Sequence, residues 1–269
     1  MTRRVRLDAE LVRRGLARSR EQAGELVAAG RVRVPGRTAV KPATQVTNAD
    51  PIVVEEPEGD SYVSRGGHKL AGALDVFGPA GLAVADRFAL DAGASTGGFT
   101  DVLLRRGAAH VLCVDVGYGQ LAWPLRTDDR VTVLDRTNVR DLTPEQVGEP
   151  RPELVVGDLS FISLRLVLPA LRAVTDPAAD LVLMVKPQFE VGREALGSGG
   201  VVREPAARAG AVRRVAQGAY DDHRLGVAAV TASPLPGPAG NVEYFLWLRA
   251  DAPPLREDAL MRAIEEGPR

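Results

Sequence analysis

The stretch LDAGASTGGFT, residues 90–100, decides the fold. An apolar run that ends in an acid is followed by a loop with three glycines, a pattern typical of a strand that turns tightly into a helix. A dinucleotide fingerprint would read G-x-G-x-x-G, but here Gly93 is followed by Gly97 and Gly98, and Asp91 precedes the turn. An acid at the mouth of the loop disfavours a pyrophosphate and favours a cofactor that carries positive charge.

S-adenosylmethionine meets this requirement, because it has no phosphate and carries a sulfonium and an ammonium group. NAD is the competing cofactor. Asp115 ends the next apolar segment and is placed to bind ribose hydroxyls. The predicted cofactor-binding residues around the turn are Asp91, Gly93, Ala94, Ser95, Thr96, Gly97, Gly98 and Asp115.

Seven strand-like segments alternate with helix-like segments through the larger part of the chain. These are residues 87–93, 110–116, 131–135, 153–159, 180–186, 226–234 and 243–249. The alternation predicts an α/β fold with a doubly wound, Rossmann-like sheet. In such sheets ligands bind beyond the carboxyl ends of the strands. Asp91, Asp115, Asp158 and Lys186 each close an apolar strand, so we expect the site at that edge.

The composition narrows the class of protein. A hydrophobic content of 45% and a charged content of 26% are ordinary for a soluble globular chain. The single cysteine, Cys113, excludes an internal disulfide and favours a reducing compartment. No apolar run approaches the roughly 18 residues of a membrane span, so we expect a cytoplasmic protein without a membrane partner. The three histidines lack metal-ligand spacing, and no metal is expected.

The basic charge is concentrated at the start of the chain. Residues 1–41 hold eleven Lys or Arg and only four Asp or Glu. Their pattern predicts two short helices that end at Gly15 and Gly30, the second opened by a capping box at Ser19, and then short strands. A compact basic α+β module with few aromatic residues favours binding to RNA phosphates and shape over base stacking.

The segment RLDAELVRRGLARSREQAGELVAAGRVRVPGRTAVKPATQV resembles the alpha-L RNA-binding domain named for a small-subunit ribosomal protein. The resemblance implies structured RNA as a partner. We expect this domain at residues 1–59, a linker at 60–63 and a methyltransferase domain at 64–269. The residues expected to contact RNA are Arg4, Arg6, Arg14, Arg18, Arg20 and Lys41.

Four ionisable residues, Lys69, Asp158, Lys186 and Glu243, follow one another in the order Lys-Asp-Lys-Glu. The order resembles the catalytic tetrad of FtsJ-type ribose 2′-O-methyltransferases. A sugar hydroxyl must lose its proton as it attacks a methyl group, and a neutral lysine can take that proton if nearby positive charge lowers its pKa. The resemblance implies that Lys186 is the base and Lys69 orients the hydroxyl. Asp158 and Glu243 would orient the lysines, and Asp158 would also face the cofactor.

Segments from end to end, including VSRGGHKL, DVGYGQLAW, DLSFISL, VKPQFEVG and SPLPGPAGNVEYFLWLR, resemble the TlyA-type rRNA methyltransferases, some of which carry the name hemolysin. This resemblance implies methyl transfer to the ribose 2′-hydroxyl of cytidine in 16S or 23S rRNA. Related enzymes meet the adenine with an acid after the third strand, where this chain has Asn138. We expect a monomer.

Two other functions compete with this interpretation. A non-catalytic RNA-binding factor for ribosome assembly would need no tetrad, yet all four residues are present. A membrane-lytic hemolysin would need membrane spans or a cationic amphipathic face. The amphipathic C-terminal segment PLREDALMRAIEEG is acidic instead.

Overall fold

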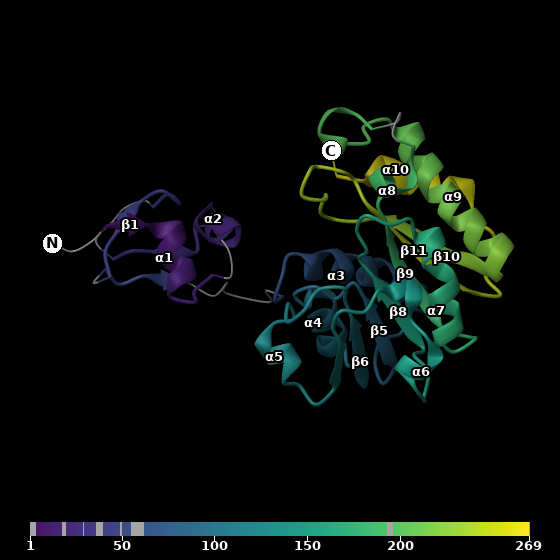
Figure 1. Ribbon diagram of the computed structural model, residues 1–269. Coiled ribbons are helices and arrows are strands. Elements are labelled where there is room, and N and C mark those ends of the chain that lie inside the picture. The colour runs from purple at the N-terminus through teal and green to yellow at the C-terminus, as the bar shows by residue number, and fades with distance from the viewer. Residues whose placement is uncertain are drawn as a thin grey trace. The chain divides into compact units, whose positions relative to one another are not determined.

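The computed structural model describes residues 4–17, 20–28, 30–35, 40–48, 50–54, 62–192 and 196–268. It divides the chain into two compact units, Met1–Ser61 and Tyr62–Arg269 (Figure 1). The expected RNA contact Arg18, the capping residue Ser19 and residues 60–61 of the expected linker lie outside the described residues. Each unit has a hydrophobic core of its own.

The N-terminal unit is a small α+β module. Helices α1 (Leu7–Arg13) and α2 (Arg20–Ala28) are followed by Gly15 (φ +72°) and Gly30 (φ +71°), left-handed positions that favour glycine. This confirms the two expected helices. Four short strands form two antiparallel pairs: β1 (Val5–Arg6) with β3 (Gln45–Val46), and β2 (Val32–Arg33) with β4 (Val53–Val54). The core residues include Leu7, Leu11, Ala23, Val27, Val32 and Val46.

The larger unit is built on a seven-stranded sheet with the order β10-β11-β9-β8-β5-β6-β7. The strands are β5 (Phe88–Ala92), β6 (His110–Val114), β7 (Val131–Leu134), β8 (Leu154–Gly157), β9 (Asp180–Val185), β10 (Leu225–Ala232) and β11 (Tyr244–Ala250). Strands β5 to β9 are parallel, whereas β11 is antiparallel to both of its neighbours. The chain runs outward from β5 through β6 to β7 and then returns to β8, so the strand order reverses between β5 and β8. The predicted α/β fold is confirmed.

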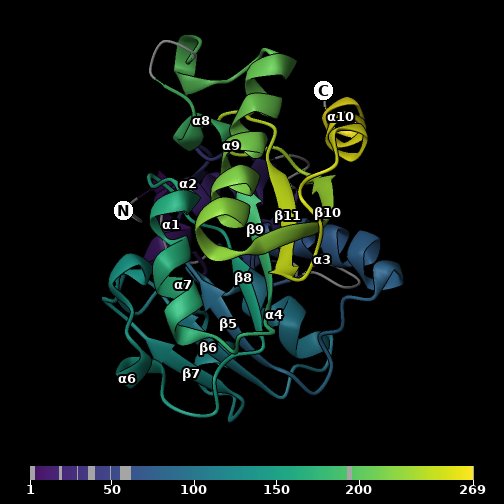
Figure 2. The ribbon, with the colours of Figure 1, turned by 90° about the vertical axis from the view of Figure 1, so that its right-hand side faces the viewer.

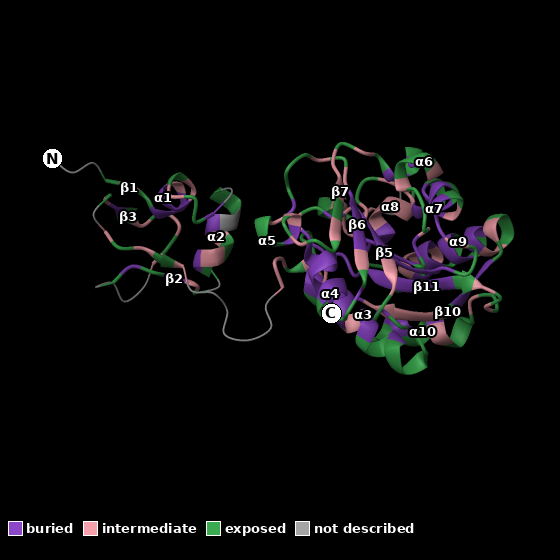
Figure 3. Cartoon of the chain, turned by 90° about the horizontal axis from the view of Figure 1, so that it is seen from below, coloured by how far each residue is buried: buried purple, intermediate pink, exposed green. Residues whose placement is uncertain are grey.

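Helices cover both faces of the sheet (Figure 2). One face carries α3 (Gly66–Phe77) and α4 (Gly98–Arg105), and the other carries α7 (Leu168–Val174) and α9 (Pro205–His223). The remaining helices are α5 (Trp123–Arg126), α6 (Pro144–Val147), α8 (Pro187–Glu190) and α10 (Glu257–Glu266). Figure 3 shows the buried strands between helices whose outer sides are exposed. No helix in the described ranges is long and apolar enough to cross a bilayer.

The direction of β11 brings its first residues to the carboxyl edge of the parallel strands. Tyr244 at the start of β11 pairs with Val185 at the end of β9. The residues just outside this pair, Glu243 and Lys186, therefore lie at the same edge although one precedes a strand and the other follows one. An antiparallel strand thus completes the site that the parallel strands begin.

The helices α3 and α4 touch at their N-terminal ends. A Cβ atom on Gly98 would clash with Ser64 Oγ and approach the Gly67 backbone nitrogen to 2.8 Å. The turn between β5 and α4, residues 93–98, is the glycine turn, and it is therefore fixed against α3, the helix that carries Lys69.

We expect Gly98→Ala to destabilise the larger unit by about 1–3 kcal/mol, because the added methyl group meets backbone atoms that cannot yield. Gly78→Ala is the matched control: Gly78 has φ −57° and no atom within 4 Å of its added Cβ. That variant should be neutral or stabilising by up to about 1 kcal/mol. Urea unfolding midpoints measure both, and equal midpoints for the two variants would contradict the close contact of α3 with α4.

Candidate active site

The turn between β5 and α4 depends on its glycines. Gly93 (φ +82°) and Gly97 (φ +94°) have left-handed backbones. A Cβ atom on Gly93 would lie 2.9 Å from the carbonyl oxygen of Asp158, just beyond β8. The turn therefore lies against the chain that leaves β8, at the point where the strand order reverses. This is the position at which doubly wound sheets bind their ligands.

Asp115 holds this turn in place. One of its carboxylate oxygens accepts a hydrogen bond from the Ser95 backbone N–H (2.8 Å), and the other accepts one from Gly117 (2.7 Å). The Asn138 side chain accepts from the backbone N–H of Arg140 (3.1 Å). Asp115 and Asn138, both expected to contact the cofactor, thus accept hydrogen bonds from nearby backbone N–H groups. Neither residue lines the pocket described below.

Asp91 lies beneath the turn. Its side chain is fully buried, and Oδ2 accepts a hydrogen bond from Thr100 Oγ1 at 2.6 Å. Among the described residues, Oδ1 has no hydrogen-bond partner. Burial raises the pKa of Asp91 to about 7, and the negative charges of Asp158 and Asp115 act in the same direction. The structure places this expected cofactor contact outside the pocket.

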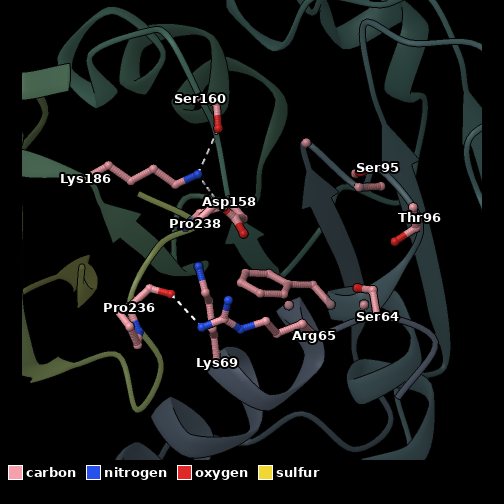
Figure 4. Close-up of a pocket in the computed structure, with 15 residues that line it drawn as sticks. Ser64, Arg65, Lys69, Ser95, Thr96, Asp158, Ser160, Lys186, Pro236 and Pro238 are labelled. Carbon is pink, nitrogen blue, oxygen red and sulfur yellow. Dashed lines mark hydrogen bonds and ion pairs between the residues drawn. The ribbon is translucent and has the colours of Figure 1, made fainter. Parts of the chain in front are cut away.

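A pocket of about 270 Å³ opens beside the turn (Figure 4). Its volume is slightly below the usual range for ligand pockets, about 300–1,000 Å³. The start of α3, the glycine turn, the segment after β8, the end of β9 and the loop before β11 all contribute to it. The lining residues are Ser64, Arg65, Gly66, Lys69, Gly93, Ala94, Ser95, Thr96, Gly98, Phe99, Asp158, Ser160, Lys186, Pro236 and Pro238.

Two ion pairs join the four residues of the expected tetrad. Lys186 Nζ lies 2.6 Å from Asp158 Oδ1 and donates to Ser160 Oγ at 2.8 Å (Figure 4). Lys69 Nζ donates to Glu243 Oε2 at 2.5 Å. Glu243 is buried behind Lys69 and does not itself line the pocket. Residues from four separate segments are thus brought together as two pairs.

Three further residues were not expected from the sequence: Ser160 and Arg65, which line the pocket, and Phe161, which follows Ser160 in the chain. Ser160 is the second partner of Lys186, and the Arg65 guanidinium donates to the Pro236 carbonyl at 3.0 Å, which ties the start of α3 to the loop before β11. Phe161, next to Ser160, is 89% exposed with φ +63°, and its ring centre lies 5.1 Å from that of Phe189. The segments that hold these residues are visible in the sequence, but nothing in their residue types predicts these contacts.

The expected RNA contacts of the N-terminal unit fall into different environments. Arg4 and Lys41 are exposed. Arg6 and Arg20 both bind the Asp8 carboxylate. Arg14 instead donates to Glu10 and to the backbone carbonyls of residues 47, 48 and 50. Within the described ranges, no cluster of three His, Cys, Asp or Glu residues could hold a metal ion.

Comparison with known proteins gives consistent matches over both units. The family model described as FtsJ-like methyltransferase matches residues 62–250, and the S4 domain model matches residues 5–52. The chain is 59% identical, over 100% of both chains, to the Mycobacterium tuberculosis protein named 16S/23S rRNA (cytidine-2′-O)-methyltransferase TlyA. It is 36% identical to Hemolysin A of Brachyspira hyodysenteriae, over 89% of this chain and 98% of that protein.

A solved structure from Streptococcus thermophilus, provisionally named a hemolysin, superposes with a TM-score of 0.77 and 37% identity. The match covers 99% of this chain and 96% of that chain. The predicted S4-type and FtsJ-type resemblances are therefore confirmed.

Replacement of Asp91 by Asn should change how stability depends on pH. The pKa of Asp91 is raised from 3.8 to about 7 on folding, so its contribution to stability is present below about pH 4 and is lost as pH rises to about 7. Asn does not titrate. We expect the urea midpoint of Asp91→Asn, relative to that of the parent, to increase as the pH rises from 5 to 8. A constant difference across this range would show that Asp91 is ionised in the folded protein throughout.

Proposed function

This chain belongs to the FtsJ-like methyltransferase family, and we propose that it transfers a methyl group from S-adenosylmethionine to the ribose 2′-hydroxyl of a cytidine in ribosomal RNA. The observation that carries the proposal is that Lys69, Lys186 and Asp158 line one pocket beside the glycine turn, with Glu243 paired to Lys69 behind it. The relative from M. tuberculosis that is 59% identical over its full length is named for this reaction on 16S and 23S rRNA.

The residues around the turn fit the cofactor. Gly93, Ala94, Ser95, Thr96 and Gly98 of the turn line the pocket, so a ligand there would lie against the turn. Asp158, which lines the pocket, would complement a positive charge, and Asp115, which accepts from the Ser95 backbone N–H, would also accept from ribose hydroxyls. Asn138 would contact the adenine, and Asp91 would act only through the turn above it. When bound, S-adenosylmethionine supplies an electrophilic methyl group on a sulfonium.

The two lysines have different roles toward the 2′-hydroxyl that accepts the methyl group. Lys69 is held by the buried Glu243, and it would donate a hydrogen bond to the 2′-oxygen and orient it. Lys186 would take the hydroxyl proton as the oxygen attacks the methyl carbon, which requires the free amine. Ser160 keeps the Lys186 side chain pointed at the pocket in either state.

Features of both units support RNA as the substrate. The S4 domain model covers residues 5–52, where the basic charge is concentrated. Enzymes that act on buried nucleotides generally extrude them and stack the free base on an aromatic or apolar side chain. Phe161 is exposed beside Ser160 and backed by Phe189, which suits it to receive such a base.

Lys186→Ala should lower methyl transfer by roughly 10²–10⁴-fold, the usual span for a positioned general base. Cofactor affinity and RNA binding should change little. Lys186→Arg should be as inactive as the alanine variant, because a guanidinium stays protonated. The measurement is single-turnover transfer of labelled methyl to purified ribosomal subunits, with cofactor affinity measured separately by calorimetry. Full activity in Lys186→Arg would mean that position 186 contributes only positive charge.

Phe161→Ala should slow transfer to subunits and leave cofactor affinity unchanged, since the loss of one base–aromatic stack costs about 1–3 kcal/mol. Phe161→Trp should retain most of the activity. Leu166→Ala is the control, because Leu166 is also an exposed apolar residue but is not aromatic and cannot form a base–aromatic stack. The stacking role would be refuted by equal transfer rates for Phe161→Ala and Leu166→Ala.

A further inference from the structure

The Asp8 carboxylate holds two arginines that come from different parts of the N-terminal unit. Arg6, just before α1, donates from Nε to Oδ1 (3.0 Å) and from Nη2 to Oδ2 (2.8 Å). Arg20, the first residue of α2, donates from Nη2 to Oδ2 (3.0 Å). The Asp8 side chain is 6% exposed, whereas those of Arg6 and Arg20 are 46% and 60% exposed. One buried acid thus anchors two cations that face solvent.

We propose that Asp8 is a positioning residue that holds Arg6 and Arg20 as a preformed clamp for a phosphate of structured RNA. This inference rests on the proposed function, which makes RNA the partner. Asp8 would not touch the RNA, and the two guanidinium groups would.

The donors that remain on the arginines support a phosphate ligand. A guanidinium has five N–H donors in a planar fork that matches the oxygens of a phosphate. Among the described residues, Arg6 and Arg20 have no hydrogen-bond partner other than Asp8, so most of their donors stay available to a ligand. Because both side chains are already ordered, less conformational entropy is lost when they bind.

Asp8 is itself held firmly. Its carboxylate accepts from the Ala9 backbone N–H at 2.8 Å, and its own N–H donates to the Pro42 carbonyl at 3.0 Å. The second bond brings the chain next to the exposed Lys41 to the start of α1. The hydrogen bond from Arg6, followed by that from Arg20, holds the pKa of Asp8 well below its usual range. The anchor therefore stays ionised at neutral pH.

Arg14 provides the contrast. Its side chain is 21% exposed, and it donates to Glu10 Oε1 (2.7 Å) and to three backbone carbonyls of residues 47–50. These bonds tie α1 to that turn and occupy the fork that a phosphate would need. We therefore infer that Arg14 stabilises the N-terminal unit, whereas Arg6 and Arg20 contact the RNA.

The test uses Asp8→Asn in the full-length chain. This variant removes both a negative charge and the anchor of the two arginines, and the two losses change RNA affinity in opposite directions. Removal of a negative charge from a basic surface should by itself tighten RNA binding. Loss of the anchor should instead weaken binding to purified ribosomal subunits, by roughly 3- to 10-fold for two side chains that must now be ordered on binding. Glu25→Gln, which removes one exposed acid from α2, is the matched control and should bind as tightly as the parent or more tightly.

A second set of variants separates position from folding. In the Arg6→Ala/Arg20→Ala background, Asp8→Asn should have no further weakening effect, because the clamp is already gone. Weakening that persists there would reflect damage to the unit and would overturn the proposal. Binding by Asp8→Asn that equals or exceeds that of the parent would also overturn it. If the parent protein itself fails to bind subunits, the proposed function fails and the clamp with it.

Discussion

The buried ion pair between Lys69 and Glu243 is the interaction on which the site depends. It joins the first helix of the larger unit to the residue before β11, 174 positions later in the sequence. Breaking such a pair from one side leaves an uncompensated buried charge, which typically costs about 3–5 kcal/mol. A Cβ on Gly237 would lie 2.7 Å from Glu243 Oε1, so the loop before β11 closes directly on this carboxylate. Helix, loop and strand are therefore fixed together.

The second pair has a different character. Lys186 and Asp158 both line the pocket, and Lys186 has an additional neutral partner in Ser160. A serine hydroxyl can accept a hydrogen bond from an ammonium or donate one to an amine. Ser160 can therefore partner Lys186 in both protonation states, which a carboxylate cannot do equally well.

The sequence was sufficient for the strands and for the order of the tetrad, because apolar runs and the charged residues that end them are local signals. It was not sufficient for environments that depend on distant contacts. The sequence predicts Asp91 as a cofactor contact at the start of the turn. Its side chain instead points to the α4 face and is buried against Thr100. Arg14 and Arg6 look alike in a count of charges, yet Arg14 is bound by carbonyls 33 to 36 residues away. The bond from Arg65 to Pro236 spans 171 residues.

The place of β11 in the sheet also sets an order of events during synthesis. Domains fold as units, N-terminal first, as the chain emerges from the ribosome. The N-terminal unit, with its own core, is complete once about residue 54 has emerged, whereas β11 inserts between β9 and β10 only after residue 250. A nascent chain thus has its basic module long before it has Glu243. A chain that has not yet reached residue 243 therefore carries the S4-type module without Glu243 or β11, so the Lys69–Glu243 ion pair and the complete sheet form only when the chain is almost finished.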